Sequence, residues 1–210
     1  MGNSYEESCT RGMRIQNWKN HKRITIFPGE YYVAHEDVLI TTLLGSCVSA
    51  CLYDPYNKIV GMNHFLLSSR RYAKSLPVCT TDAGRYGIHS MELLINEMWN
   101  QGAQRGNLKA KAFGGGSILK PADAFTSNFF TVGEVNVRFI IEFFQNEKIP
   151  LVSSDLGGTV GRVINFYSED FSVYVRKMVA KSVSVVKREE QYWEKSIQKQ
   201  EESETQIDLW

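Results

Sequence analysis

Hydrophobic and polar positions along the chain repeat with two periods, which together predict a mixture of strands and helices. Apolar residues at three-to-four spacing predict one helix that begins at Thr80–Asp82 and ends near Gly102, and a second over about 133–147. Short runs rich in β-branched residues predict strands over 24–27, 31–33, 38–43, 48–53, 58–67, 108–112, 151–152, 163–166 and 171–175. Because the strands do not alternate regularly with helices, the pattern favours an α+β fold over a doubly wound parallel sheet.

The two ends of the chain depart from this pattern. Residues 1–23 are mostly polar, and charged residues dominate from Lys187 onward. We therefore predict a folded domain over 24–184, a polar N-terminal extension over 1–23, and a charged C-terminal tail over 185–210 that is partly helical or disordered.

Composition narrows the function classes. A hydrophobic content of 43% supports a real core, and a net charge of +1 excludes a protein built around a phosphate backbone. No apolar run approaches the ~20 residues of a membrane span, and the N-terminus is not of the secretory type, so we expect a cytoplasmic protein with no membrane insertion and no nucleic acid partner. The four cysteines are then reduced, and their spacing fits no metal site.

The candidate chemistry lies at a corner between two predicted strands. The segment Gly45–Ser46–Cys47 interrupts two apolar runs, where small residues present a cysteine at least partly to solvent. His64 follows on the return strand, and a thiol with a histidine base is the minimum equipment of a cysteine hydrolase. The other reading is that a cysteine in an apolar strand is a small buried hydrophobe, which is how we interpret Cys51 and Cys79.

Whether the two residues meet depends on the turn that follows Asp54. A two-residue loop at Pro55–Tyr56 places Cys47 directly opposite His64. A three-residue loop with Asn57 in the left-handed region turns His64 to the other face, unless a bulge near Gly61 restores the pairing.

Further groups nearby suit the same chemistry. A hydroxyl from Thr41 or Thr42 could orient the imidazole, and the backbone N–H groups of Gly45–Ser46–Cys47 could hold an oxyanion. The run Gly114–Gly115–Gly116 lacks the ending of a phosphate-binding loop, so we interpret it as a tight exit from a strand.

Four motifs resemble those of one family, the bacterial chemoreceptor glutamine deamidase CheD. They are Leu-Gly-Ser-Cys-Val-Ser-Ala-Cys-Leu-Tyr-Asp-Pro at 44–55, Gly-Met-Asn-His-Phe-Leu-Leu at 61–67, Lys-Ala-Phe-Gly-Gly-Gly at 111–116, and Asp-Leu-Gly-Gly-Thr-Val-Gly-Arg at 155–162. The resemblance implies that Cys47 is the catalytic cysteine and His64 the catalytic histidine, and it assigns the third role to Thr41 rather than Thr42. It also implies an α/β sandwich of mixed β-sheets with outer helices, similar to that of a deamidating bacterial toxin.

The same resemblance implies a reaction and its partners. The reaction is hydrolysis of a glutamine side-chain amide in chemoreceptor cytoplasmic helices, without a cofactor or metal; the same chemistry could hydrolyse a glutamyl methyl ester. A CheC-type chemotaxis phosphatase is the implied partner. The alternative function is a binding module that regulates this phosphatase, with deamidation secondary; an intact set of Cys47, His64 and Thr41 favours the enzyme.

Overall fold

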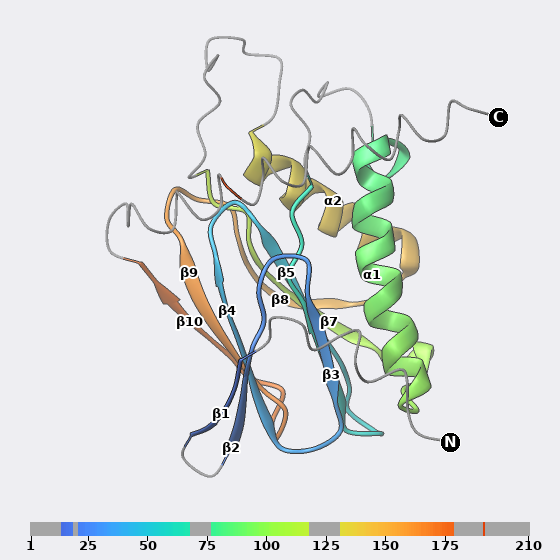
Figure 1. Ribbon diagram of the computed structural model, residues 1–210. Coiled ribbons are helices and arrows are strands. Elements are labelled where there is room, and N and C mark those ends of the chain that lie inside the picture. Colours follow the sequence, from blue (N-terminus) through green and yellow to red (C-terminus); the bar gives the residue numbers. More distant parts are fainter. Residues whose placement is uncertain (1–13, 19–20, 68–76, 118–130, 179–190, 192–210) are drawn as a thin grey trace, which may run out of the picture.

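The computed structural model describes residues 14–18, 21–67, 77–117, 131–178 and 191. Two α-helices, two 3₁₀ turns and ten strands lie within these ranges (Figure 1). In chain order they are β1 (Arg14–Trp18), β2 (His21–Thr25), β3 (Tyr31–Ala34), β4 (Val38–Leu44), β5 (Val48–Asp54), β6 (Ile59–Asn63), η1 (Val78–Thr80), α1 (Asp82–Asn100), η2 (Arg105–Asn107), β7 (Lys109–Gly114), α2 (Val132–Glu147), β8 (Leu151–Leu156), β9 (Arg162–Tyr167) and β10 (Val173–Lys177).

The strands form two five-stranded mixed sheets. The first has the order β1-β2-β4-β9-β10, in which only β2 and β4 are parallel. The second has the order β3-β6-β5-β7-β8, in which only β7 and β8 are parallel. The chain passes from the first sheet to the second directly between β4 and β5.

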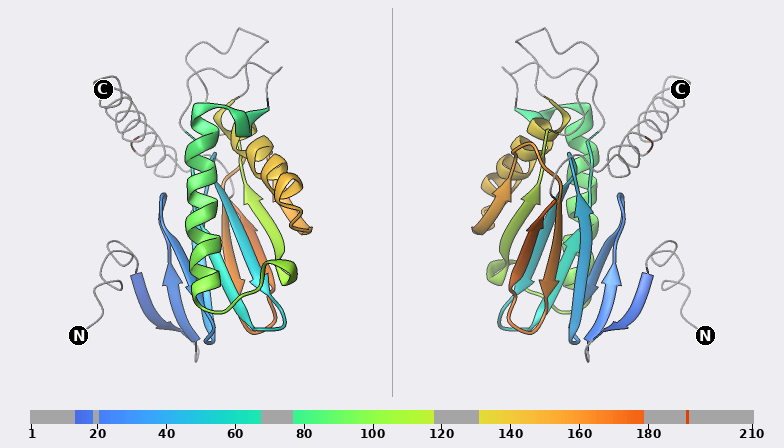
Figure 2. Two further views of the ribbon diagram at one scale, coloured as in Figure 1. Left: turned by 90° about the vertical axis from the view of Figure 1, so that its right-hand side faces the viewer. Right: turned by 90° about the vertical axis from the view of Figure 1, so that its left-hand side faces the viewer.

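Three layers result, with a separate hydrophobic core on each face of the second sheet. Both helices cover its outer face, as the two side views show (Figure 2). The helix-side core includes Val48, Ala50, Leu52, Met91, Leu94, Phe139 and Phe143. The inter-sheet core, between the two sheets, includes Ile24, Ile40, Leu44, Cys47, Cys51, Val60, Met62, Ile164 and Phe166. Alternate residues of β5 thus face different cores, as the twofold period of a strand requires.

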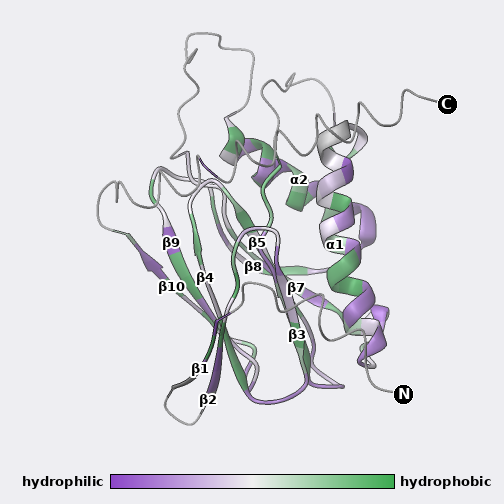
Figure 3. Cartoon of the chain, viewed as in Figure 1, coloured by the Kyte–Doolittle hydropathy of each residue, from purple (hydrophilic) through white to green (hydrophobic). Residues whose placement is uncertain are grey.

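Both helices begin at a threonine cap. The side chain of Thr81 accepts a hydrogen bond from the Gly84 N–H, and Thr131 forms a full capping box with Glu134. Along α1 and α2 hydrophobic and hydrophilic positions succeed one another, as in helices with one buried face (Figure 3).

The α+β class and the mixed sheets with outer helices are confirmed, and three predicted boundaries need correction. Residues 14–18 and 21–23 lie in β1 and β2 instead of a polar extension, because an edge strand with exposed side chains lacks an apolar pattern. The return strand ends at Asn63, not Leu67, and β8 continues to Leu156 instead of ending at Val152. The predicted tail lies outside the described residues, apart from Gln191.

Candidate active site

The corner at Gly45–Ser46–Cys47 is held by the glycine run at the end of β7. The N–H of Gly115 donates to the Cys47 carbonyl at 2.7 Å, and the N–H of Gly116 donates to the Gly45 carbonyl at 2.7 Å. These bonds dock the corner against the second sheet, so the run is the strand exit that the sequence predicted.

Two of these glycines leave no room for a side chain. Gly114 and Gly115 have φ values of +113° and +69°, in the region that favours glycine. A Cβ at Gly114 would lie 2.2 Å from the Cys47 carbonyl oxygen, and one at Gly115 would lie 2.2 Å from Cγ2 of Val137. The corner at Gly45–Ser46–Cys47, the strand exit and α2 therefore pack closely against one another.

The carbonyl anchors also determine where the N–H groups of the corner point. Each carbonyl of Gly45 and Ser46 shares a trans peptide with the next residue's N–H, which points the opposite way. The Gly45 carbonyl binds Gly116 and the Ser46 carbonyl accepts from Asn136, so the N–H groups of Ser46 and Cys47 point away from these anchors. This orientation suits the predicted oxyanion donors, whose role stays a prediction.

The hairpin between β5 and β6 has a four-residue loop, so both turn predictions were wrong. Pro55–Lys58 form the loop, with Lys58 in the left-handed region at φ +55°. Cys51 then pairs with Met62, and Val48 forms a bridge with Phe65. A four-residue loop shifts the pairing by two positions relative to a two-residue loop, so each side chain stays on the same face of the sheet. His64 therefore shares a face with Cys47 without a bulge at Gly61.

This register places the two predicted catalytic residues on one face of the sheet. It sets His64 opposite Ser49 and therefore diagonal to Cys47, a separation that a histidine side chain spans. Cys47 belongs to the inter-sheet core, and His64 reaches across that same core to the first sheet, as its partner shows. Direct contact between the thiol and the imidazole stays a prediction.

His64 is oriented by Thr42. The Thr42 hydroxyl lies 2.8 Å from Nδ1 of His64, and it also lies 2.8 Å from the Ile26 carbonyl. A carbonyl only accepts, so the hydroxyl proton goes to Ile26, and the oxygen must accept from a proton on Nδ1. This network leaves Nε2 as the bare, basic nitrogen of the ring.

That nitrogen is buried and lacks a hydrogen-bond partner among the described residues. His64 is 2% exposed, and burial lowers its pKa to about 3, so the imidazole is neutral at physiological pH. A neutral ring with its lone pair on Nε2 is the form that a general base requires.

The prediction that Thr41 orients His64 is wrong in its contact. The Thr41 hydroxyl donates to the Ile164 carbonyl at 3.0 Å, while the adjacent Thr42 faces the inter-sheet core with Ile40 and Leu44. Strand alternation sends neighbouring threonines to opposite faces, so Thr42 faces His64 and Thr41 faces away from it.

The prediction of a partly accessible Cys47 is also wrong, because its side chain is fully buried. A glutamine side chain reaches Sγ only if neighbouring groups move. Cys51 is equally buried on the same face of β5, and burial raises its pKa to about 12, which confirms the interpretation of Cys51 as a buried hydrophobe.

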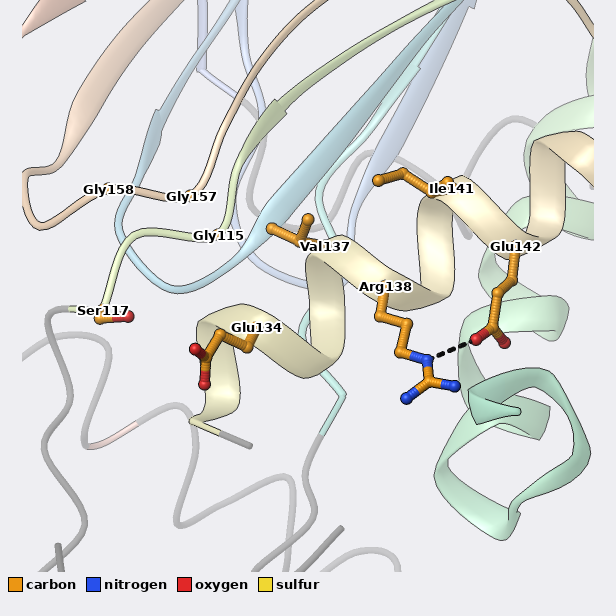
Figure 4. Close-up of a pocket in the computed structure, with 9 residues that line it drawn as sticks. All are labelled: Gly115, Ser117, Glu134, Val137, Arg138, Ile141, Glu142, Gly157 and Gly158. Atoms are coloured by element: carbon orange, nitrogen blue, oxygen red, sulfur yellow. Dashed lines mark hydrogen bonds and ion pairs between the residues drawn. The ribbon is translucent and has the colours of Figure 1, made fainter. Parts of the chain in front are cut away.

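A hollow of about 530 Å³ lies beside this corner without including Cys47 (Figure 4). Gly115 and Ser117 form one wall, and Val137 and Ile141 of α2 form another. Its remaining lining residues are Glu134, Arg138, Glu142, Gly157 and Gly158, with an ion pair of 2.7 Å between Arg138 and Glu142.

The described residues contain no group of three or more histidine, cysteine, aspartate or glutamate side chains that could hold a metal ion. None of their helices is both long enough and apolar enough to cross a membrane.

Comparison with known proteins gives one consistent family. The family model described as CheD chemotactic sensory transduction matches residues 72–177. A probable chemoreceptor glutamine deamidase CheD 1 of Geobacter sulfurreducens is 53% identical over 199 residues, 94% of this chain and 98% of its own length. Proteins of the same description from Shewanella oneidensis and Methylobacillus flagellatus are 47% and 38% identical, over 72% and 91% of this chain and 74% and 92% of their own lengths.

A solved structure shows a more distant likeness. The YfiH protein of Bacillus licheniformis aligns with 60% of this chain and 49% of its own length, at a TM-score of 0.36 and 16% identity.

Proposed function

The chain belongs to the CheD family, and we propose from this premise that it is a chemoreceptor glutamine deamidase in which Cys47 is the nucleophile, His64 the base and Thr42 the residue that orients His64. The observation that carries the assignment is the neutral His64 ring, whose Nδ1 is occupied by Thr42 while Nε2 is unpartnered within the described structure. In such a ring, Nε2 has a free lone pair that can accept the proton of a thiol.

The first half of the reaction forms a thioester. Nε2 of His64 takes the proton of the Cys47 thiol, and the sulfur attacks the carboxamide carbon of a receptor glutamine. The carbonyl oxygen becomes an oxyanion, for which the N–H groups of Ser46 and Cys47 are the proposed donors. The C–N bond then breaks, and the proton on Nε2 leaves with the nitrogen as ammonia.

The second half regenerates the enzyme. A water molecule gives a proton to Nε2 and its hydroxide attacks the thioester carbon. The C–S bond breaks, glutamate is released, and the proton returns from His64 to the Cys47 sulfur. One imidazole carries both transferred protons, the new carboxyl group releases its own proton to solvent, and the cycle uses no cofactor.

The depressed pKa of His64 limits when this transfer occurs. An imidazolium is costly in the buried core, so the imidazole at rest is neutral. We propose that movement of the groups covering Cys47 admits the glutamine and lowers this cost, so that proton transfer follows substrate binding.

The test is peptide mass mapping of purified receptor cytoplasmic fragments after incubation with wild-type protein, Cys47→Ala or Cys51→Ala. We expect conversion of specific glutamines to glutamate with the wild type and with Cys51→Ala, and none with Cys47→Ala. Cys51 is a matched control, since it is a fully buried cysteine on the same face of β5. Conversion by Cys47→Ala would refute the proposed nucleophile.

A CheC-type phosphatase remains the proposed partner, supported by the family resemblance. If Cys47→Ala releases no ammonia but still binds the phosphatase in a pull-down with purified proteins, deamidation and partner binding are independent functions of the protein. If binding persists while the wild-type protein deamidates no receptor fragment, the alternative of a binding module replaces the enzyme.

A further inference from the structure

The buried amide of Asn136 connects the two segments that carry the proposed catalytic residues. Asn136 lies on the inner side of α2 and is 0% exposed. Its Oδ1 accepts from the Leu67 N–H at 2.8 Å, and its Nδ2 donates to the Ser46 carbonyl at 3.1 Å. Ser46 precedes Cys47, and Leu67 follows His64 by three residues.

The hydrogen bonds of this amide allow only one orientation. The second Nδ2 proton goes to the Val132 carbonyl at 2.9 Å, one turn earlier in α2. Rotating the amide by 180° would set NH₂ against the Leu67 N–H and oxygen against two carbonyls, so the arrangement shown is the one that satisfies every group. The contacts join positions that are 69 and 90 residues apart from Asn136 along the chain.

The helix that carries Asn136 is itself docked onto the corner. A Cβ at Gly133 would lie 2.6 Å from the Gly115 carbonyl oxygen, so the first turn of α2 rests directly on the strand exit that holds the Cys47 carbonyl. Val137 and Ile141 of the same helix line the hollow (Figure 4). Asn136 therefore reaches both catalytic segments from a rigid, capped element.

We propose that Asn136 is a positioning residue, which holds the corner of Cys47 and the segment after His64 at the separation needed for proton transfer. The inference rests on the proposed function. Loss of the Nδ2 donor frees the Ser46 carbonyl and lets the corner shift, and a shift of about 1 Å at reacting groups lowers a rate by about 100-fold.

The pH dependence of the catalytic defect in Asn136→Asp distinguishes a positioning role from a purely structural one. Aspartate keeps an acceptor for Leu67 but faces the carbonyls of Ser46 and Val132, which repel its ionised form. The protonated acid restores one donor, and burial raises the pKa of a carboxyl in such a place. The catalytic defect should therefore shrink as the pH falls.

The experiment measures kcat and KM of wild type, Asn136→Asp, Asn136→Ala and Ser168→Ala on a purified receptor fragment between pH 5.5 and 8.5. Ser168 is the control for lost stability, since its hydroxyl bonds both the N–H and the carbonyl of Val38 at the far end of β4. Circular dichroism and thermal unfolding report the folded fraction of each variant.

We expect kcat of Asn136→Asp to fall about 10- to 100-fold at pH 8 with KM within about threefold of wild type, and the ratio to wild type to rise as the pH is lowered. Asn136→Ala should show a defect that does not narrow with pH, and Ser168→Ala should keep wild-type kcat per folded molecule. A pH-independent defect in Asn136→Asp, or wild-type kcat in both Asn136 variants, overturns the inference while the deamidase assignment stands. A wild-type protein without activity overturns both.

Discussion

The two faces of the second sheet are built from the same strands but contain different side chains. On the helix side, Phe139 and Phe143 pack against the sheet in a hydrophobic core, where the buried amide of Asn136 has a hydrogen-bond partner for its oxygen and for both protons of its nitrogen. In the inter-sheet core, Thr42, Cys47 and His64 lie among residues such as Ile40 and Met62. The polar groups gather where β4 passes into β5, because there the first sheet supplies the hydroxyl of Thr42 and the second supplies His64 and Cys47.

The comparison shows how a buried site differs from a buried core. Hydrophobic packing leaves few polar atoms to satisfy, whereas the inter-sheet core leaves one ring nitrogen, Nε2 of His64, without a partner among the described residues. An unpaired buried polar atom costs about 1–3 kcal/mol of folding stability. Such a cost is expected where function requires a free lone pair.

The largest expected effect separates catalysis from stability in the inter-sheet core. Cys47→Ala should lower kcat on a receptor fragment by at least about 10⁴-fold, since the proposed nucleophile is lost, while the free energy of unfolding changes by about 1 kcal/mol. Ammonia release and urea unfolding measure the two quantities. A comparable loss of activity in Cys51→Ala would contradict the distinction between the two cysteines.

The helix-side core should show the reverse pattern. Phe139→Ala removes a fully buried ring that lies edge-on to Phe65, at a centroid distance of 5.5 Å. We expect a loss of about 3–5 kcal/mol in the free energy of unfolding, measured by urea denaturation, with kcat per folded molecule within about threefold of wild type. Unchanged stability would mean that the helices contribute little to the second sheet.

The neighbouring residues Thr41 and Thr42 of β4 test whether the contact with His64 is what distinguishes a catalytic from a structural hydroxyl. Thr42→Val removes the acceptor of Nδ1 and should lower kcat by about 10- to 100-fold, because the ring loses its tautomer and orientation. Thr41→Val makes the same chemical change one position away and removes only a bond to the Ile164 carbonyl. In steady-state kinetics, kcat should fall more in Thr42→Val than in Thr41→Val. A larger fall in Thr41→Val would support Thr41, the residue that the family resemblance assigned.

The smallest effect concerns pH. His64 has a folded pKa of about 3, below the value of about 6.5 in an unfolded chain, so between these values the unfolded state binds more protons. Stability is therefore lost as the pH falls from about 6.5 toward 3, by about 2 kcal/mol at pH 5 from this residue.

Urea unfolding of the wild type and His64→Gln at pH 7 and pH 5 measures this contribution. The variant should lose less stability between the two pH values than the wild type. Parallel losses in both proteins would mean that His64 is protonated in the folded state.

Much of the fold could be predicted from local patterns. The apolar run at Val38–Leu43 and the spacing of Phe139, Ile140, Phe143 and Phe144 predicted β4 and α2 to within a residue or so, because each pattern is the imprint of a buried face. The polar edge strand β1 was not predicted, because it has no apolar pattern and is extended through its pairing with β2.

The site was predicted less completely. The turn that begins Asp-Pro-Tyr-Asn suggested a loop of two or three residues, whereas the structure has four, and Asp54 stabilises this loop. Its carboxylate accepts from the N–H groups of Tyr56, Asn57 and Gln104, the last of them 50 residues away. A contact with a residue 50 positions along the chain cannot be predicted from the sequence of the turn.

By itself the sequence determined the residue types of the site, the corner that separates two strands, and the α+β class, because these depend on neighbours within a few positions. Tertiary structure decided that Thr42 and not Thr41 meets His64, that Cys47 is buried rather than partly accessible, and that Asn136 joins their segments. Each of these depends on which faces of two sheets and a helix come together, and that is set by packing between distant parts of the chain.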